Sequence, residues 1–314
     1  MQRSNWGGRD GEPAPPEAAS GPVAPGGYRS VFRAGLFAGR VAIVTGGGSG
    51  IGRCTAHELA ALGARIAIVG RTQAKLERVV GELRQDGLEA VCHVCDIRDE
   101  ARVREVVAAV IAQFGRIDHL VNNAGGQFAA PLERISAKGF DAVVRTNLLG
   151  GFLMARECYT QWLHAHGGSI VNIVADMWHG MPGMGHSGAA RAGMVNFTET
   201  AALEWAGANV RVNAVAPGWI ASEGMDRYPP ERAAYIRNRK NLSPMGRVGT
   251  ESEVSAAIVF LLSEAAGFIS GTTLRVDGAV PNARPFVPLP RPEQPLAGFN
   301  GFHRSQLPKV LENE

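Results

Sequence analysis

The chain has few cysteines, no long apolar run and no cluster of basic residues, and each absence excludes a class of protein. Four cysteines in 314 residues are too few for a disulfide framework, so we expect reduced thiols. No stretch approaches the roughly 20 continuous apolar residues that a membrane span needs, and the first residues lack the apolar segment typical of a secretion signal. These absences favour a cytoplasmic protein that does not enter a membrane.

The distribution of charge disfavours a nucleic-acid partner. The 32 basic and 29 acidic residues give a formal net charge of +3, and the basic residues are scattered singly along the chain. A protein that follows a phosphate backbone needs its basic residues gathered together. Hydrophobic residues make up 45% of the chain and charged residues 19%, which is typical of a globular protein with a large core. We therefore expect a small-molecule partner.

The two ends of the chain differ in composition from its middle. Residues 1–27 hold six glycines and five prolines with little apolar content, which predicts a disordered or loosely ordered arm that extends to residue 37. Six prolines between Pro281 and Pro295 exclude a helix and predict an extended carboxyl-terminal arm over 280–314. This arm also carries large apolar residues such as Phe299 and Phe302, so we expect it to pack on a neighbouring subunit or over the rim of the substrate pocket.

Between residues 38 and 279, short β-branched runs alternate with helical patterns. This alternation predicts parallel strands, right-handed crossovers and helices on both faces of a sheet. The expected fold class is therefore α/β, with a single doubly wound Rossmann domain. The β-branched runs are RVAIVT, RIAIVG, VCHVCD, HLVNNAG, SIVNIV, RVNAVAPG and TLRVDG. Helices are expected from about residues 50 and 73 and over 99–114 and 187–207.

A glycine-rich turn, TGGGSGIG, connects the first strand to the first helix. Glycines at this point let the backbone approach a pyrophosphate, and the amino terminus of the helix supplies free N–H groups and positive potential. The context of strand, turn and helix favours dinucleotide binding over a purely structural turn. The expected cofactor contacts in this turn are Thr45, Gly46, Ser49, Gly50, Ile51 and Gly52.

The residues after the second and third strands bear on which dinucleotide binds. A carboxylate after the second strand would hold the ribose hydroxyls of NAD, but the chain has Arg71 there, which suits the 2′-phosphate of NADP. We therefore expect NADP, with NAD possible; the alternative is an ordinary solvent-facing arginine. Asp96 is placed to bind the adenine amine, next to Ile97, or to cap the segment that begins at Arg98.

Together these motifs resemble the short-chain dehydrogenase/reductase family over about 240 residues. The resemblance rests on TGGGSGIG, Asp96, NNAG at 122–125, Asn147, SIVNI at 169–173, and a Pro-Gly pair at 217–218. It implies a seven-stranded parallel sheet with the active site at the carboxyl ends of the strands. It also implies a homotetramer with the last strand at an interface. The further cofactor contacts that it implies are Asn123, Ala124, Gly125, Arg191, Pro217, Gly218 and Ile220.

The chain departs from this family at its catalytic residues. The family uses a serine on the fifth strand and a tyrosine four residues before a lysine. Alignment on the helix ARAGMVNFTETAALEWA places Ser187 at the tyrosine position and Arg191 at the lysine position, with Val174 or Ala175 at the serine position. No tyrosine stands four residues before a lysine anywhere in the chain, and only Asn147 of the family's catalytic set is kept.

These departures constrain the chemistry. Arg191 stays protonated and Ser187 alone is a poor acid or base, so ordinary ketone reduction is disfavoured. Conjugate reduction of an α,β-unsaturated thioester needs only hydrogen-bond donors and positive charge at the enolate oxygen, which Ser187, Arg191 and Asn147 can supply. Asp176 and His186 are candidates for proton transfer, although a loop-capping carboxylate and a structural histidine are equally ordinary interpretations.

Three functions remain open at this point. GLFAGRVAIVTGG, NNAGGQF and HSGAARAG resemble peroxisomal trans-2-enoyl-CoA reductases, which indicates reduction of an acyl-CoA. ADMWHGMPGMGHSGAARAGM resembles a bacterial group known as citronellol/citronellal dehydrogenases, which indicates a terpenoid substrate. A nucleotide-binding protein without catalysis is the third hypothesis. We expect no metal, because Cys92 and Cys95 lie in one strand pattern and no second cysteine pair completes a site.

Overall fold

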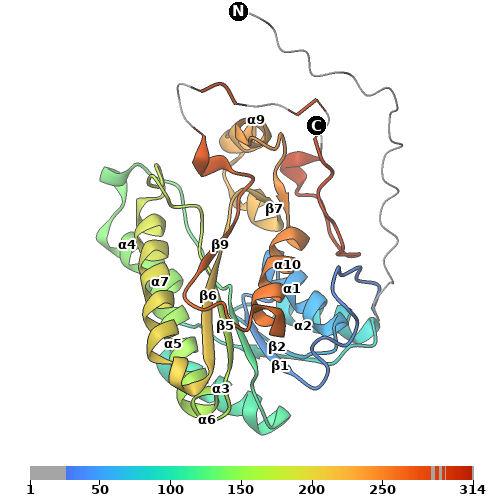
Figure 1. Cartoon of the computed structure of the whole chain (residues 1–314). Coiled ribbons are helices and arrows are strands. Elements are labelled where there is room, and N and C mark those ends of the chain that lie inside the picture. Colours follow the sequence, from blue (N-terminus) through green and yellow to red (C-terminus); the bar gives the residue numbers. More distant parts are fainter. Residues whose placement is uncertain (1–25, 284–286, 290–291, 294, 313–314) are drawn as a thin grey trace, which may run out of the picture.

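A seven-stranded parallel sheet forms the centre of the molecule (Figure 1). The computed structural model describes residues 26–283, 287–289, 292–293 and 295–312. Every neighbouring pair in the sheet is parallel, and the strand order is β3-β2-β1-β4-β5-β6-β9. This confirms the predicted doubly wound sheet. The strands are β1 (Val41–Thr45), β2 (Arg65–Gly70), β3 (Ala90–Val94), β4 (His119–Asn122), β5 (Gly168–Ile173), β6 (Val210–Pro217) and β9 (Thr273–Val276).

Helices cover both faces of the sheet, and apolar residues of the strands contact both helix layers. In Figure 1 the two layers stand on opposite sides of the strands. One layer holds α1 (Gly50–Ala61), α2 (Gln73–Gln85) and α10 (Glu251–Leu262). The other holds α3 (Glu100–Phe114), α4 (Ala137–Val144), α5 (Gly150–Cys158) and α7 (Gly185–Glu204), with the short α6 (His164–His166) at the end of α5.

Local sequence explains where several of these helices begin. Asp99 accepts a hydrogen bond from the backbone of Arg102 and so caps α3. Thr250 and Glu253 form a reciprocal capping box at the start of α10. Between α4 and α5 the helix continues through a wider π-turn at Arg145–Leu149, which contains Asn147. Such π-turns frequently occur at functional sites.

A lid lies over the carboxyl ends of the strands, between β6 and α10. It contains the short strand pair β7 (Ile220–Ala221) and β8 (Gly249–Thr250) and the helices α8 (Ala233–Arg237) and α9 (Arg239–Leu242). Figure 1 shows this segment in orange above the sheet. No helix among the described residues combines the length and apolar character needed to span a membrane.

The segment before the first strand is packed into the protein. Tyr28 is 0% exposed and Phe37 is 2% exposed, so the prediction of a loose arm through residue 37 is wrong for residues 26–37. The physical reason is that Tyr28 stacks on Phe302 of the carboxyl-terminal arm, with 5.8 Å between the ring centroids, and bonds to Glu58. Residues 1–25, the rest of the predicted arm, lie outside the described residues.

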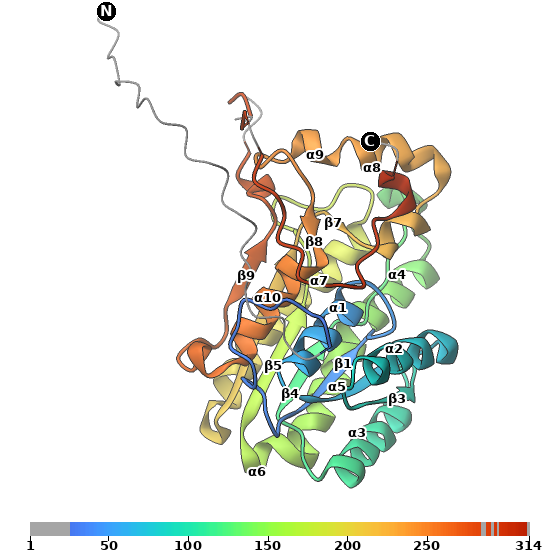
Figure 2. The ribbon, with the colours of Figure 1, turned by 90° about the vertical axis from the view of Figure 1, so that its right-hand side faces the viewer.

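The described part of the carboxyl-terminal arm packs on its own chain. Figure 2 shows it, in red, running across α1 and ending beside α8. Phe302 is buried against α1, where the guanidinium of Arg53 lies 4.9 Å from its ring centroid. Leu311 packs with Met225 and Ile236 of the lid. The arm therefore links α1 to the lid.

Candidate active site

The glycine-rich turn is held tightly against the end of β4. The hydroxyl of Thr45 accepts hydrogen bonds from the backbone N–H groups of Asn123 and Ala124, both at 3.0 Å. The side-chain amide of Asn123 donates to the carbonyl of Thr45 at 3.0 Å. A Cβ atom at Gly46 would lie 2.8 Å from that amide, and one at Gly52 would clash with it. These glycines are therefore needed for the packing of the turn as well as for access to a pyrophosphate.

The first residue of α1 sits beside a buried carboxyl group. Gly50 has a φ of +58°, which only glycine adopts freely, and the adjacent Ser49 is the N-cap residue. A Cβ at Gly50 would lie 3.8 Å from Oε1 of Glu251. Burial raises the pKa of Glu251 to about 7, while Arg53 opposes the shift and Glu223 adds to it. Ile51 packs against the core beneath the turn. The amino terminus of α1 therefore lies beside a carboxyl group that keeps its proton to a higher pH than an ordinary glutamate does.

The residues at the expected adenosine end carry two guanidinium groups. Arg71 is exposed directly after β2. The side chain of Arg98 donates to the carboxylate of Asp96 at 2.5 and 2.9 Å, and with the nearby charge of Arg71 this lowers the pKa of Asp96. The backbone N–H of Arg98 also donates to the Asp96 carboxylate at 3.1 Å, so Asp96 holds the turn at Arg98, while the helix itself begins at Glu100 and is capped by Asp99. Ile97 is buried against Gly150.

Ser187 and Arg191 lie on one side of α7, near the ends of β4 and β5. Ser187 is fully buried and donates to the side-chain carbonyl of Gln127 at 2.6 Å. Arg191 is 9% exposed and donates to the carbonyl of Ile173 at 2.6 Å. Burial lowers the pKa of Arg191 to about 10, so the guanidinium stays charged at neutral pH. A Cβ at Gly125 would clash with this guanidinium. The structure therefore places a cation and a hydroxyl beside the glycines that follow β4.

Asn147 fixes the backbone of the same glycine segment. Its amide donates to the carbonyl of Gly126 at 2.9 Å, and its carbonyl accepts from the N–H of Gly126 at 2.9 Å. Asn147 is 2% exposed, so both halves of its amide are used for this contact. In the described structure Asn147 shapes the site next to Arg191 and Gly125.

The two candidates for proton transfer lie in different environments. Asp176 is partly exposed after β5, and burial together with the negative charge of Asp277 raises its pKa. His186 is fully buried, its ring lies 4.4 Å from that of Phe128, and its nitrogens have no hydrogen-bond partner among the described residues. Among the described residues, His186 makes no hydrogen bond to Ser187, and its ring packs edge-on against Phe128.

The remaining expected cofactor contacts follow β6. Pro217 is the last residue of β6, and the N–H of Gly218 donates to the carbonyl of Val276 at 2.9 Å. A Cβ at Gly218 would lie 2.8 Å from Asp277, so the close approach of these two loops requires glycine. Ile220 opens β7, and its side chain is buried in the core. The backbone of this segment faces the same edge of the sheet as the glycine-rich turn.

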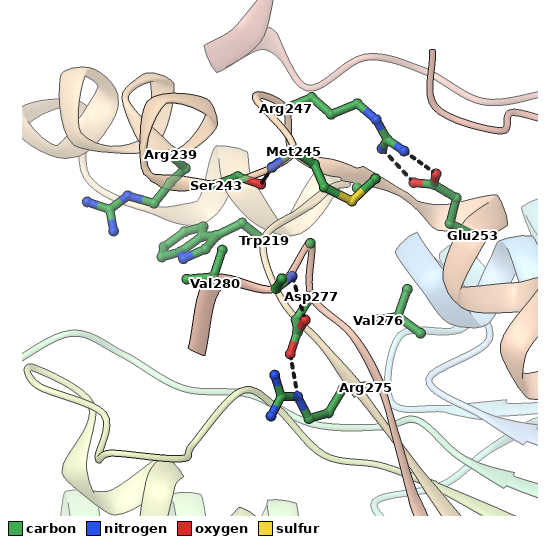
Figure 3. A pocket seen from close by; sticks show the side chains of 13 residues that line it. Trp219, Arg239, Ser243, Met245, Arg247, Glu253, Arg275, Val276, Asp277 and Val280 are labelled. Carbon is green, nitrogen blue, oxygen red and sulfur yellow. Dashed lines mark hydrogen bonds and ion pairs between the residues drawn. The ribbon is translucent and has the colours of Figure 1, made fainter. Parts of the chain in front are cut away.

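A cavity of about 330 Å³ opens beneath the lid (Figure 3). Its lining includes Trp219, Arg239, Met245 and Asp277, and the view shows these side chains converging from the lid and from the loop after β9. The guanidinium of Arg239 lies 5.2 Å from the ring of Trp219. Neither Ser187 nor Arg191 lines this cavity, so it does not contain the candidate catalytic pair.

Two residues in the site were missed by sequence reasoning. Gln127 bridges Ser187 and the lid, because its amide donates to the hydroxyl of Tyr228 at 3.3 Å. The same hydroxyl lies 4.0 Å from the sulfur of Met184. Gln127 directly follows the NNAGG segment, which offered a weak signal. Tyr228 belongs to no motif, and only folding of the lid brings it here.

The doubly wound sheet, the glycine-rich turn after β1 and the buried cation beside the glycines after β4 are typical of an oxidoreductase of the Rossmann type. The chain belongs to the short-chain dehydrogenase/reductase family. A family model described as "Enoyl-(Acyl carrier protein) reductase" matches residues 46–280. The chain is 34% identical over 242 residues to a probable 2,4-dienoyl-CoA reductase of Bacillus subtilis. The match covers 76% of this chain and 95% of the relative.

Two further relatives have dehydrogenase names. The chain is 38% identical over 242 residues to D-threitol dehydrogenase of Mycolicibacterium smegmatis, which covers 76% of this chain and 92% of the relative. Among solved structures, it is similar to the citronellol catabolism dehydrogenase AtuB of Pseudomonas aeruginosa. That pair has 59% sequence identity and a TM-score of 0.73, and the match covers 81% of this chain and 100% of AtuB.

Proposed function

We propose that the protein is an NADPH-dependent reductase of α,β-unsaturated acyl thioesters such as enoyl-CoA. The observation that carries this proposal is the buried, permanently charged Arg191 beside the hydroxyl of Ser187, where the family pattern has a lysine and a tyrosine. Such a pair stabilises negative charge but is poorly suited to exchange protons at neutral pH. Conjugate reduction generates an enolate, whose oxygen needs that stabilisation.

The residues divide this chemistry between them. Bound NADPH supplies the hydride that is added to the β carbon. The guanidinium of Arg191, held in a poorly solvated position by the carbonyl of Ile173, stabilises the charge that develops on the thioester oxygen. Ser187 donates a second hydrogen bond to that oxygen when it leaves Gln127. Asn147 keeps the adjacent glycine backbone in place.

The reaction also needs one proton at the α carbon. The hydroxyl of Tyr228 is held above the site by Gln127, which itself bonds to Ser187. An enolate carbon is a far stronger base than a phenolate, so a phenol can donate a proton to it. We assign this proton donation to the hydroxyl of Tyr228. A proton from water then restores the hydroxyl. In total, one hydride and one proton convert the enoyl thioester and NADPH into the saturated thioester and NADP.

The preference for NADP rests on Arg71. This exposed guanidinium directly follows β2, where a charge-assisted pair with a 2′-phosphate is geometrically possible. Arg98 adds a second guanidinium nearby, but it is already paired with Asp96. The negative charge of a 2′-phosphate is therefore better matched at this end of the site than the uncharged ribose hydroxyl of NAD.

A second candidate function is oxidation of a terpenoid alcohol. The observation in its favour is the 59% identity to AtuB, whose name assigns it to citronellol catabolism. This reaction needs a base for the hydroxyl proton. Asp176 suits that role because its raised pKa makes it a stronger base than an ordinary carboxylate. His186 offers nitrogens without partners among the described residues, but its ring is fully buried.

Paired assays distinguish these functions. NADPH oxidation is followed with crotonyl-CoA and longer enoyl-CoA esters, and NAD(P) reduction is followed with citronellol. The proposal requires enoyl-dependent turnover that Ser187→Ala lowers, while Ser136→Ala, which removes only the cap of α4, leaves turnover unchanged. Turnover with citronellol alone contradicts the proposal and supports the second candidate. Tight NADPH binding without turnover on either substrate supports the non-catalytic alternative.

We further propose that the chain forms a homotetramer through the edge of its sheet. β9 is the last strand of the sheet, and its outer edge has no neighbouring strand among the described residues. All four of its residues are partly exposed in the single chain. An unpaired strand edge invites association with a second copy. Light scattering of the purified protein measures the mass, and a monomeric mass contradicts this proposal.

A further inference from the structure

A cluster of ligating side chains lies far from the catalytic residues, where the carboxyl-terminal arm crosses α1 and α2. His57 comes from α1, Asp86 directly follows α2, and His303 belongs to the arm. Their three potential ligand atoms all lie within 4.8 Å of one another. In Figure 2 α1 is blue, α2 is teal and the arm is red, and the arm passes beside α1.

The distances suit one small cation. Nδ1 of His57 lies 3.6 Å from Oδ2 of Asp86, and Nε2 of His303 lies 3.0 Å from the same oxygen. A tetrahedral zinc ion with bonds of about 2.0–2.1 Å holds its ligand atoms roughly 3.4 Å apart. Two of the three pairs of ligand atoms therefore stand close to the separations around a shared ion, and the third pair lies within 4.8 Å.

The buried histidine is oriented as a metal ligand. Nε2 of His57 lies 3.3 Å from the carboxylate of Glu82, so an N–H group at Nε2 can donate a hydrogen bond to that carboxylate. That tautomer leaves a bare lone pair on Nδ1, which is buried and has no hydrogen-bond partner among the described residues. A lone pair facing a carboxylate oxygen is unfavourable unless a cation lies between them. A metal-bound histidine usually donates the N–H of its other ring nitrogen to a carboxylate or a carbonyl, as Nε2 of His57 can do with Glu82.

The donor atoms of the three side chains agree with this arrangement. Two nitrogens and one oxygen are a ligand set that favours zinc and similar divalent transition metals.

Two arginines face the same cluster and balance its carboxylates. Arg53 donates to Glu82 at 2.7 Å, and Arg304 donates to Oδ1 of Asp86 at 2.5 Å. Nε of Arg304 also lies 3.1 Å from Oδ2 of Asp86 and 3.2 Å from Nε2 of His303. A bound ion would take the place of Nε of Arg304 beside Oδ2 of Asp86 and Nε2 of His303. The hydrogen bond from Arg304 to Oδ1 of Asp86 would persist.

We propose that His57, Asp86 and His303 bind one zinc-like divalent ion, which fastens the carboxyl-terminal arm to α1 and α2. The ion has three protein ligands, and water completes its coordination. Further along the arm, Leu311 packs against the lid. The ion therefore stabilises the arm between α1 and α2 at one end and the lid at the other. The cysteine spacing that argued against a metal does not bear on this site, since its ligands come from three distant segments.

The test uses the full-length protein, treated with EDTA and desalted, and titrates ZnCl2 by calorimetry. We expect one ion per chain, and His303→Ala, whose partly exposed side chain can be removed without opening the core, should lower the affinity at least tenfold. The control variant His164→Ala, on the exposed α6, should bind as the parent does. MgCl2 should show no binding, because magnesium prefers oxygen ligands.

A second measurement reports on the arm itself. Trypsin cleaves after Arg304, and zinc should slow this cleavage in the parent and in His164→Ala but not in His303→Ala. Comparison with and without ZnCl2 on each protein separates protection of the arm from any effect of zinc on trypsin. Equal zinc affinity of the parent and His303→Ala, or no zinc binding by the parent, would overturn the proposal.

Discussion

Glu251 allows a quantitative prediction for the dependence of stability on pH. Its side chain is 7% exposed, and burial raises its pKa from the ordinary value of 4.5 to about 7. Each unit of pKa difference between the folded and unfolded chain corresponds to about 1.4 kcal/mol. The ionised carboxylate therefore costs about 3 kcal/mol of folding stability once the group is fully charged.

The direction in which folding stability changes with pH follows from whether the folded or the unfolded chain keeps the proton of Glu251. Below pH 4.5 Glu251 is protonated in both states and has no effect on the pH dependence. Between pH 4.5 and 7 the unfolded chain releases this proton while the folded chain retains it, so stability falls as pH rises. Above pH 7 the loss is complete. Glu251→Gln keeps the shape without the charge, so its advantage over the parent should grow from near zero at pH 4.5 to about 3 kcal/mol at pH 8.

Thermal unfolding at fixed protein concentration measures this difference. For a chain of this size we expect the variant to melt about 5 °C above the parent at pH 8, with little difference at pH 4.5. Comparing two proteins cancels other buried acids such as Glu58. A difference in melting temperature that stays constant from pH 4.5 to 8 would refute the reasoning, because it would mean that Glu251 ionises normally in the folded protein.

Glu253, two residues further along α10, provides a control of opposite sign. Its burial is more than offset by hydrogen bonds from Arg247, so its pKa is lowered. It therefore stabilises the folded protein above the pKa of the unfolded state, and this contribution is lost as the pH falls through the lowered value. Glu253→Gln should be less stable than the parent at pH 8, and the deficit should shrink in acid. If the stability of both variants relative to the parent changed in the same direction with pH, the assignment of a raised pKa to Glu251 would be contradicted.

Three further predictions concern the site. Arg71→Ala should remove most of the preference for NADPH over NADH in equilibrium binding, whereas equal affinities in the parent would contradict the cofactor assignment. Arg191→Lys combined with Ser187→Tyr should raise any carbonyl reduction and leave enoyl reduction unchanged or lower; no gain with intact cofactor binding would show that this pair does not limit that chemistry. Tyr228→Phe should lower kcat for enoyl reduction at least tenfold, with Tyr235→Phe as the unchanged control on the lid; equal kcat values would remove Tyr228 from the mechanism.

The sequence alone was sufficient for the fold and for the position of the glycine-rich turn, because both depend on local patterns. Alternating β-branched runs and helical periods required a doubly wound sheet, and the glycines of TGGGSGIG could be placed between a strand and a helix. The prediction that Ser187 and Arg191 stand where the family has a tyrosine and a lysine also comes from the sequence, since alignment along one helix needs no tertiary information.

Tertiary structure decided the contacts between distant segments. Gln127 and Tyr228 meet beside Ser187 only because the lid closes over the glycines after β4. Glu251 acquires its raised pKa from packing against α1, some 200 residues earlier in the chain. The segment around Tyr28 is ordered because Phe302 covers it, which composition could not indicate. Such contacts depend on which surfaces the folded elements bury together, and this information is spread over the whole chain.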